Sequence, residues 1–212
     1  MPDWIGAMQA VVDQYARTSA ALGAEFYDAQ RAAARATGPF TVPVADPPPA
    51  EQSEASLRWA TKDVWPRDPE EATPAQLQPL EARLEQAEKK AEQVAQKLVA
   101  DTGRGTVRAA VRRDRAAVGY ARAAALGACA FCKLLAARGM VYKAETVDFR
   151  SHDGCHCGPI PVFKGQRFEL SPQASEWERL YQEYAAPYPG DQPRRFRRAL
   201  AEHDSNPLPG SN

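Results

Sequence analysis

The segment TPAQLQPLEARLEQAEKKAEQVAQKL, residues 73–98, decides the predicted fold. It opens with a capping box, in which Thr73 is the N-cap, Pro74 is the first helical residue and Gln76 reaches back to the cap. Apolar residues then recur at alternating steps of three and four, a heptad seam of three repeats formed by Leu77, Leu80, Leu84, Ala87, Ala91, Val94 and Leu98. The pattern predicts a helix over 74–100, packed in a helical hairpin of the same chain or in a coiled coil.

The N-terminal region, residues 1–37, is a second predicted helix. Large and small apolar residues recur there with a period near 3.6 and define one stripe: Trp4, Met8, Val11, Tyr15, Leu22, Phe26, Ala29 and Ala33. Either another helix of this chain or a partner protein must cover this stripe. Residues 38–54 hold five prolines, which predicts an extended linker, and a helical region over 55–126 follows.

Arginines gather in the second half of that helical region. The segment 101–106 contains two glycines and is expected to end the heptad helix, so that a new Arg-rich helix spans 106–126. Its predicted basic stripe consists of Arg108, Arg112, Arg115 and Arg122. Asp114 is the single acid among them. The stripe is either a solvated helix face or a contact for an acidic partner or a phosphate backbone.

The composition excludes several classes of protein. The chain has 212 residues, with 27 Lys and Arg against 27 Asp and Glu, so no overall field favours nucleic acid or an anionic membrane. No secretory signal opens the sequence, and no run approaches the roughly 18 apolar residues that a membrane span requires. We therefore expect no membrane partner, and any electrostatic function must come from local clusters.

All four cysteines lie between residues 129 and 157, in the spacing C-x2-C-x22-C-x-C. Paired cysteines of this kind hold structural zinc, although a single residue between the second pair is tighter than the usual spacing. The site is predicted to use four of the five residues Cys129, Cys132, His152, Cys155 and Cys157. Free thiols, a disulfide, or a catalytic thiol activated by His152 or His156 are the alternatives.

The C-terminal part combines extended chain with helices. Residues 159–163 and 166–170 flank Lys164-Gly165, which predicts a short β-hairpin or irregular extended chain. Helices are expected over 171–203 and a flexible tail over 204–212. The predicted fold class is therefore mainly α, with long helices and a small Cys/His subdomain over 127–170.

The cysteine region resembles a known family. The stretch 127–142, followed by Phe149, residues 152–157 and residues 161–163, is similar to the MuF-like minor capsid or head-morphogenesis proteins of tailed phages, in the form found in phages of actinobacteria. The resemblance covers roughly residues 104–170. Its motif positions are Cys129, Cys132, His152, Cys155 and Cys157.

The resemblance implies a structural virion component, made in the host cytoplasm and placed in the head interior or at the portal vertex. Its implied partners are the portal protein, the major capsid protein or scaffold, and packaged DNA, with no small-molecule substrate. Some relatives carry the label of capsid maturation protease, but the residues offer no clear nucleophile and base, so we expect no enzyme and no catalytic residues. A Cys/His protease and a zinc-stabilised DNA-binding module are the alternatives.

Overall fold

A computed structural model describes residues 2–64, 72–140, 142–143, 151, 154–155 and 157–204. Over these residues the fold is mainly α, as predicted. It contains six helices and one three-stranded sheet, where the sequence had predicted at most a short β-hairpin. The chain divides into two compact units: unit 1 is Met1–Gly23, Val44–Gly105 and His152–Gly154, and unit 2 is Ala24–Pro43, Thr106–Ser151 and Cys155–Asn212. No helix among the described residues is long and apolar enough to cross a membrane.

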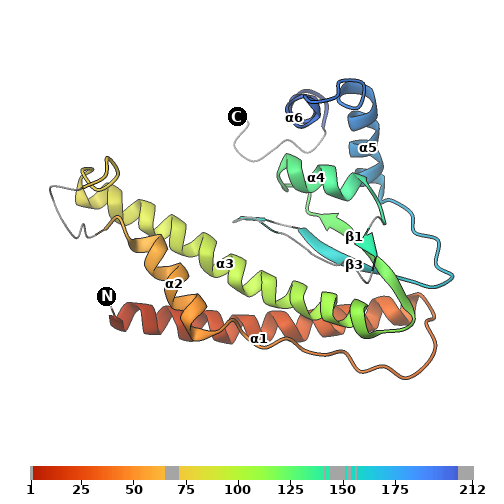
Figure 1. Cartoon of the computed structure of the whole chain (residues 1–212), viewed down its shortest axis with the longest axis horizontal. Helices are drawn as coiled ribbons and strands as arrows, with labels where there is room; N and C mark the ends of the chain where they lie inside the picture. Colours follow the sequence, from red (N-terminus) through yellow and green to blue (C-terminus); the bar gives the residue numbers. More distant parts are fainter. Residues whose placement is uncertain are drawn as a thin grey trace. The chain divides into compact units, whose positions relative to one another are not determined.

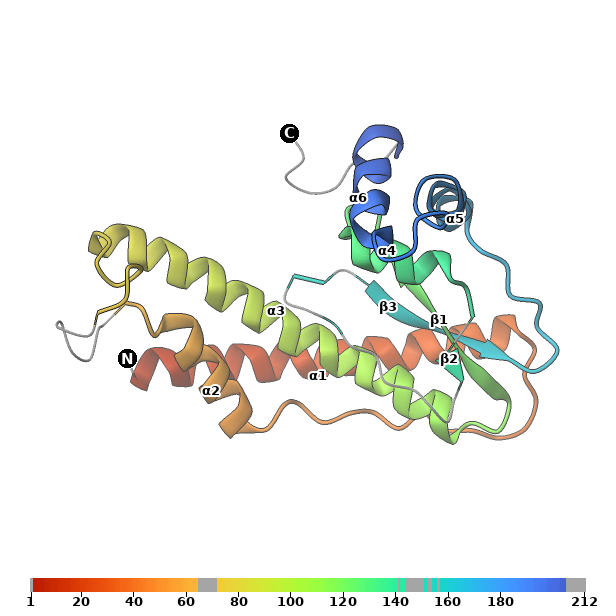
Figure 2. The same cartoon turned by 45° about the horizontal axis from the view of Figure 1, so that its top comes forward.

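Unit 1 is built from three helices. They are α1 (Pro2–Ala33), α2 (Ala50–Thr61) and α3 (Leu80–Arg113), of which α1 and α3 continue into unit 2. Figures 1 and 2 show α1 and α3 side by side. The core of this unit consists of Ile5, Val12, Leu57, Ala60, Ala91, Val94 and Leu98. The heptad seam of α3 is therefore internal packing in its second half, whereas Leu77, Leu80 and Leu84 are exposed.

The apolar stripe predicted for α1 is not its buried face. Val12 is 1% exposed and Ala16 is fully buried, whereas Val11 is 45% and Tyr15 59% exposed. The prediction followed the largest apolar side chains, but the buried face contains both large and small ones, with Ala16 and Ala20 on either side of Ser19, which contacts Gly103 of α3. The buried residues of α1 are Ile5, Val12, Ala16, Ala20 and Tyr27. The residues of the predicted stripe do recur with the helical period, but most of them are exposed to solvent.

The capping box forms, but it does not start the long helix. The backbone N–H of Thr73 donates to Gln76 Oε1 at 2.9 Å, and the backbone N–H of Gln76 donates to Thr73 Oγ1 at 3.4 Å. Residues 74–77 make only a turn, and α3 begins at Leu80. Pro79 explains the difference, since a proline disfavours helical backbone in the residue before it. The helix therefore restarts immediately after the proline.

The predicted break at 101–106 is wrong, because α3 continues through it to Arg113. Gly103 lies in the helix where α3 meets α1: a Cβ placed on it would stand 2.5 Å from Ser19 Oγ and 2.7 Å from the Ser19 carbonyl oxygen. The glycine provides room for a close helix–helix contact instead of a helix end. The helix ends at Asp114, whose carboxylate accepts from the backbone N–H of Ala116 at 2.9 Å.

The Arg-rich helix over 106–126 is also wrong in its second half. Residues Ala117–Ala124 form strand β1, the centre of a sheet ordered β2-β1-β3. Strand β2 is Tyr142–Lys143, strand β3 is Cys157–Phe163, and both are antiparallel to β1. Alanine favours helix, but pairing on both edges of β1 overrides that propensity.

The hairpin predicted around Lys164-Gly165 does not form. Strand β3 pairs with β1, and residues 166–170 follow the turn as irregular chain. The remaining helices of unit 2 are α4 (Ala130–Ala137), α5 (Pro172–Tyr184) and α6 (Gln192–His203). A cluster around Trp177, Leu180 and Phe196 packs α4, α5 and α6 together.

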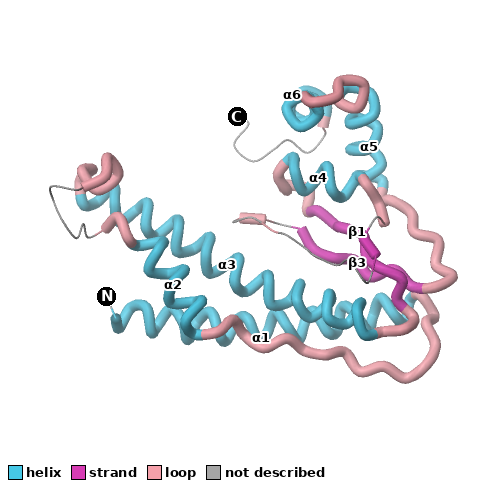
Figure 3. Tube along the Cα trace, viewed as in Figure 1, coloured by secondary structure: helices cyan, strands magenta, loops and turns pink. Residues whose placement is uncertain are grey.

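The proline-rich linker begins and ends earlier than predicted, because α1 ends at Ala33 and not at residue 37. Helix α2 begins at Ala50, directly after three consecutive prolines, and not after residue 54. Figure 3 shows the residues between α1 and α2 as loop. The predicted tail, 204–212, lies outside the described residues except for Asp204.

Candidate metal centre

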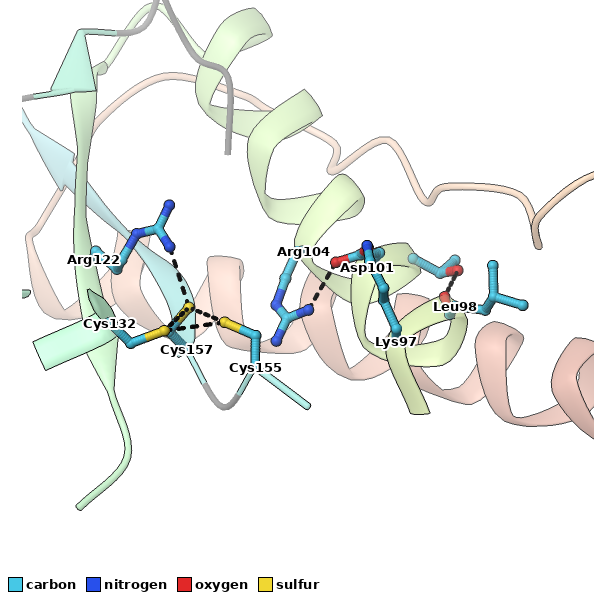
Figure 4. A network of polar contacts seen from close by, with 9 residues as sticks. Lys97, Leu98, Asp101, Arg104, Arg122, Cys132, Cys155 and Cys157 are labelled. Carbon is cyan, nitrogen blue, oxygen red and sulfur yellow. Dashed lines mark hydrogen bonds and ion pairs between the residues drawn. The ribbon is translucent and has the colours of Figure 1, made fainter. Parts of the chain in front are cut away.

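Three cysteine sulfur atoms meet in the core of unit 2. The Sγ atom of Cys132 lies 3.2 Å from that of Cys155 and 3.5 Å from that of Cys157, and the last two are 2.8 Å apart. Two sulfur atoms that each lie about 2.3 Å from a tetrahedral zinc ion are about 3.8 Å apart, so the three atoms would separate by a fraction of an ångström to about 1 Å around a shared ion. The three side chains are buried, and Figure 4 shows their sulfur atoms turned toward one another. The group could hold a metal ion.

Local backbone structure explains how Cys155 and Cys157 reach the same site. Cys157 is the first residue of β3, and Cys155 lies just before that strand. The Sγ atoms of these two residues are 2.8 Å apart, although only one residue separates them in the sequence. Helix α4 brings Cys132 to the site from its first turn.

Arg122 is the charged neighbour of the sulfur atoms. Its Nη1 atom donates to Cys157 Sγ at 3.3 Å, a contact drawn in Figure 4. The register places Ala124 of β1 opposite Cys157 and Arg122 opposite Pro159, so the guanidinium reaches the cysteine diagonally across the two strands. Arg122 is 4% exposed. It therefore belongs to the cysteine site and not to an exposed basic stripe.

The thiols of Cys132 and Cys157 favour their protonated form, which is less reactive than the thiolate. Hydrogen bonds to Cys155 and Cys157, followed by burial, raise the pKa of the Cys132 thiol above its ordinary value. At Cys157 the hydrogen bond from Cys132 lowers the pKa, but the hydrogen bond with Cys155 and burial outweigh it, and the net pKa is raised. Without a metal, the thiols of Cys132 and Cys157 are therefore poor nucleophiles.

The other two predicted ligands lie differently. Cys129 is half-buried and is the N-cap of α4, one turn before Cys132, but it is not part of the three-sulfur group. His152 lies outside the described residues, as does His156. The structure thus brings together three of the five predicted metal ligands.

The predicted basic stripe divides into separate positions. Arg108 and Arg112 are on α3, Arg115 is in the turn that follows, and Arg122 is in β1. Arg112 and Arg115 are exposed, together with Arg113. Asp114 faces inward, where its Oδ2 accepts from Tyr27 at 3.1 Å and from Arg31 at 2.9 Å.

A buried ion pair close to the cysteines was missed by the sequence analysis. The Nζ atom of Lys133 contacts Asp204 Oδ2 at 2.6 Å, and both side chains are fully buried. The same carboxylate accepts from Trp177 Nε1 at 3.1 Å and from Gln173 at 3.3 Å. No local sequence pattern predicts this pair, because its two residues are 71 positions apart. A lysine is also normally expected on the surface.

Comparison with known proteins agrees with part of the resemblance. Neither the curated proteins nor the solved structures contain a match to this chain. A family model, described as VG15 protein, matches residues 1–184. Because that match covers most of the sequence, the chain belongs to the VG15 protein family, which indicates a phage-encoded protein.

Proposed function

We propose that the chain is a structural, non-enzymatic minor capsid protein of the MuF-like type, which docks on the portal or the inner capsid of a tailed phage head. Membership of the VG15 family supports a phage origin. The finer assignment rests on the cysteine-region resemblance, whose residues Cys132, Cys155 and Cys157 form one buried cluster.

The observation that carries the docking proposal is the exposed apolar side of α1. Within unit 1, this side presents Trp4, Val11, Tyr15 and Leu22, which are 39–59% exposed. Scattered apolar residues are normal on a surface, but a row at helical spacing along one helix marks an interaction site. Their burial against a partner helix or groove would supply affinity, since aromatic anchors contribute most to such interfaces.

A groove next to this row extends the apolar surface in unit 1. Its volume is about 750 Å³; Trp4 and Met8 of α1 and Leu84 of α3 line it, and it is also lined by the small residues Ala87, Ala91 and Ala95. Exposed Glu88 and Glu92 stand at its edge. The surface thus fits an amphipathic helix of the portal or inner capsid whose apolar side chains are flanked by Lys or Arg.

The test changes the exposed row without touching the core. A Tyr15→Glu, Leu22→Glu variant should fold and be excluded from heads, because two charges would be buried in the interface. Deletion of the whole helix is unsuitable, since α1 supplies the buried Val12, Ala16 and Tyr27. The matched control is Gln86→Glu, Gln93→Glu, which adds the same charge to exposed positions of α3. Wild-type incorporation of the folded Tyr15 and Leu22 variant would refute the docking proposal.

The cysteine cluster supports a structural zinc site. Sulfur donors favour zinc over magnesium and calcium, and a closed site would join α4 to β3 in unit 2. Purified protein prepared under reducing conditions should contain one zinc per chain, and the absence of stoichiometric zinc would refute this assignment. A closed four-ligand zinc site would leave no thiolate free to attack a peptide bond, which argues against a Cys/His protease. Capsid-protein processing that disappears in folded Cys132→Ala protein would overturn the non-enzymatic proposal.

A second contact is favoured by the exposed arginines at the end of α3. Arg113 and Arg115 are exposed on either side of Asp114, whose charge is balanced internally by Arg31. The local excess of positive charge fits packaged DNA or an acidic portal surface. DNA affinity that falls with salt, and falls further in Arg113→Glu, Arg115→Glu protein, would support DNA. No DNA binding at low salt would exclude it.

A further inference from the structure

A structural zinc site needs a fourth ligand beyond the three buried sulfur atoms. Zinc in such sites is almost always four-coordinate and tetrahedral. Cys132, Cys155 and Cys157 supply three thiolates from α4 and from the start of β3. The fourth must come from a residue whose backbone is already next to this group.

Cys129 has that position. It is the N-cap of α4, and an N-cap side chain turns back over the first helical turn, toward the second and third residues of the helix. The third residue of α4 is Cys132. A sulfur atom at the N-cap and one at the third position can therefore grip the same ion.

Cys129 lies half-buried against the core cluster of unit 2 that contains Cys132, Cys155 and Cys157. That cluster also contains Ala128, the neighbouring residue, which is fully buried and fixes the chain at this point. A rotation about the Cα–Cβ bond of Cys129 moves its sulfur atom without moving the backbone.

The charges of unit 2 suit a site of four thiolates. Four thiolates and one zinc ion carry two negative charges, which cost free energy in a buried place unless they are balanced. The Arg122 guanidinium lies 3.3 Å from Cys157 Sγ. The N-terminal end of α4, at Cys129 itself, contributes backbone N–H groups and the positive end of the helix dipole.

We propose that Cys129 is the fourth ligand, so that four thiolates and no histidine close the site. This assignment rests on the proposed zinc site. It makes the cluster fully coordinated, with no position left for a water molecule or substrate.

X-ray absorption at the zinc edge of the wild-type protein tests the assignment directly. Four sulfur neighbours at about 2.3 Å are expected, and three sulfurs with one nitrogen would overturn it. Cobalt-substituted variants give a second readout. Cys129→Ser should change the visible spectrum and weaken zinc binding by more than the roughly 10–100-fold typical of losing an outer-shell partner. His152→Ala and His156→Ala are the matched controls and should leave both unchanged.

The two proposals fail in different ways. Wild-type protein without stoichiometric zinc would refute the zinc site itself. Zinc that is present, with a spectrum altered by His152→Ala and unaltered by Cys129→Ser, would refute Cys129 as ligand and leave the zinc site intact. If Cys129→Ser does not fold, the absorption measurement on wild-type protein still decides the ligand set.

Discussion

Replacing Gly103 by alanine tests the close contact between α1 and α3. In an isolated helix this change stabilises the helix by about 1 kcal/mol, because alanine has a higher helix propensity than glycine by that amount. Here the added Cβ would lie 2.5 Å from Ser19 Oγ and 2.7 Å from the Ser19 carbonyl oxygen. The hydroxyl can rotate away, but the carbonyl belongs to α1 and moves only with the helix. Overpacking of this kind costs typically 1–3 kcal/mol, and a backbone contact belongs at the upper end.

Gly6→Ala is the matched control, because both glycines lie inside helices. A Cβ at Gly6 meets no atom within 4 Å, so only the helix propensity changes. We expect Gly6→Ala to raise the free energy of unfolding by about 0.5–1 kcal/mol, and Gly103→Ala to lower it by about 1–2 kcal/mol after its propensity gain is subtracted. Urea unfolding followed by far-UV circular dichroism measures both values.

The outcome that contradicts the reasoning is equal stabilisation by the two substitutions. It would mean that α3 and α1 do not meet at Gly103 and Ser19. A Ser19→Ala, Gly103→Ala double variant refines the test. It should recover only the part of the loss that comes from the hydroxyl, because the carbonyl contact remains.

Three further predictions concern α1, the buried ion pair and the cysteine site. Val11→Asp should change the free energy of unfolding by less than about 1 kcal/mol, whereas Val12→Asp, at a position 1% exposed, should cost more than about 3 kcal/mol; similar thermal melting of the two variants would refute the phase of α1. Asp204→Ala should cost about 3–5 kcal/mol because it leaves Lys133 charged and buried, and Lys133→Met in the same chain should recover part of it; an additive double variant would show that the pair is not coupled. Arg122→Met should weaken zinc binding about 10–100-fold in a competition titration with a chelator, and unchanged affinity would remove Arg122 from the site.

The sequence predicted the class of fold and the helices better than their boundaries and faces. Helical periodicity in 1–37 and 77–98 reports which residues can share a face, and both segments are largely helical. It does not report which of two adjacent faces is covered. On α1 the covered face contains Val12 and Ala16, whereas Val11 and Tyr15, each one position earlier, are exposed.

Long-range pairing explains the errors after residue 113. The segment over 117–124 has an alanine-rich composition that locally favours helix, and its partner strand β3 begins 33 residues after it ends. Among the described residues β3 is an edge strand that pairs only with β1, so it accommodates the prolines at 159 and 161. Neither fact is visible within a window of the sequence. The cysteine spacing did predict the candidate metal ligands Cys132, Cys155 and Cys157, because thiols in two distant segments can be recognised as ligands of one metal ion without knowing the fold between them.

Three buried polar groups join elements of unit 2 to one another. Asp114 joins the end of α3 to α1 through Tyr27 and Arg31, and Lys133 joins α4 to the end of α6 through Asp204. The cysteine group joins α4 to β3. A buried polar group costs free energy in any arrangement that leaves it unpaired. Each of these groups therefore disfavours alternative packings, even where its net contribution to the free energy of unfolding is small. In unit 1 the exposed apolar side chains of α1 include Val11, Tyr15 and Leu22. The proposed docking surface therefore uses residues of α1 that none of these three buried polar groups includes.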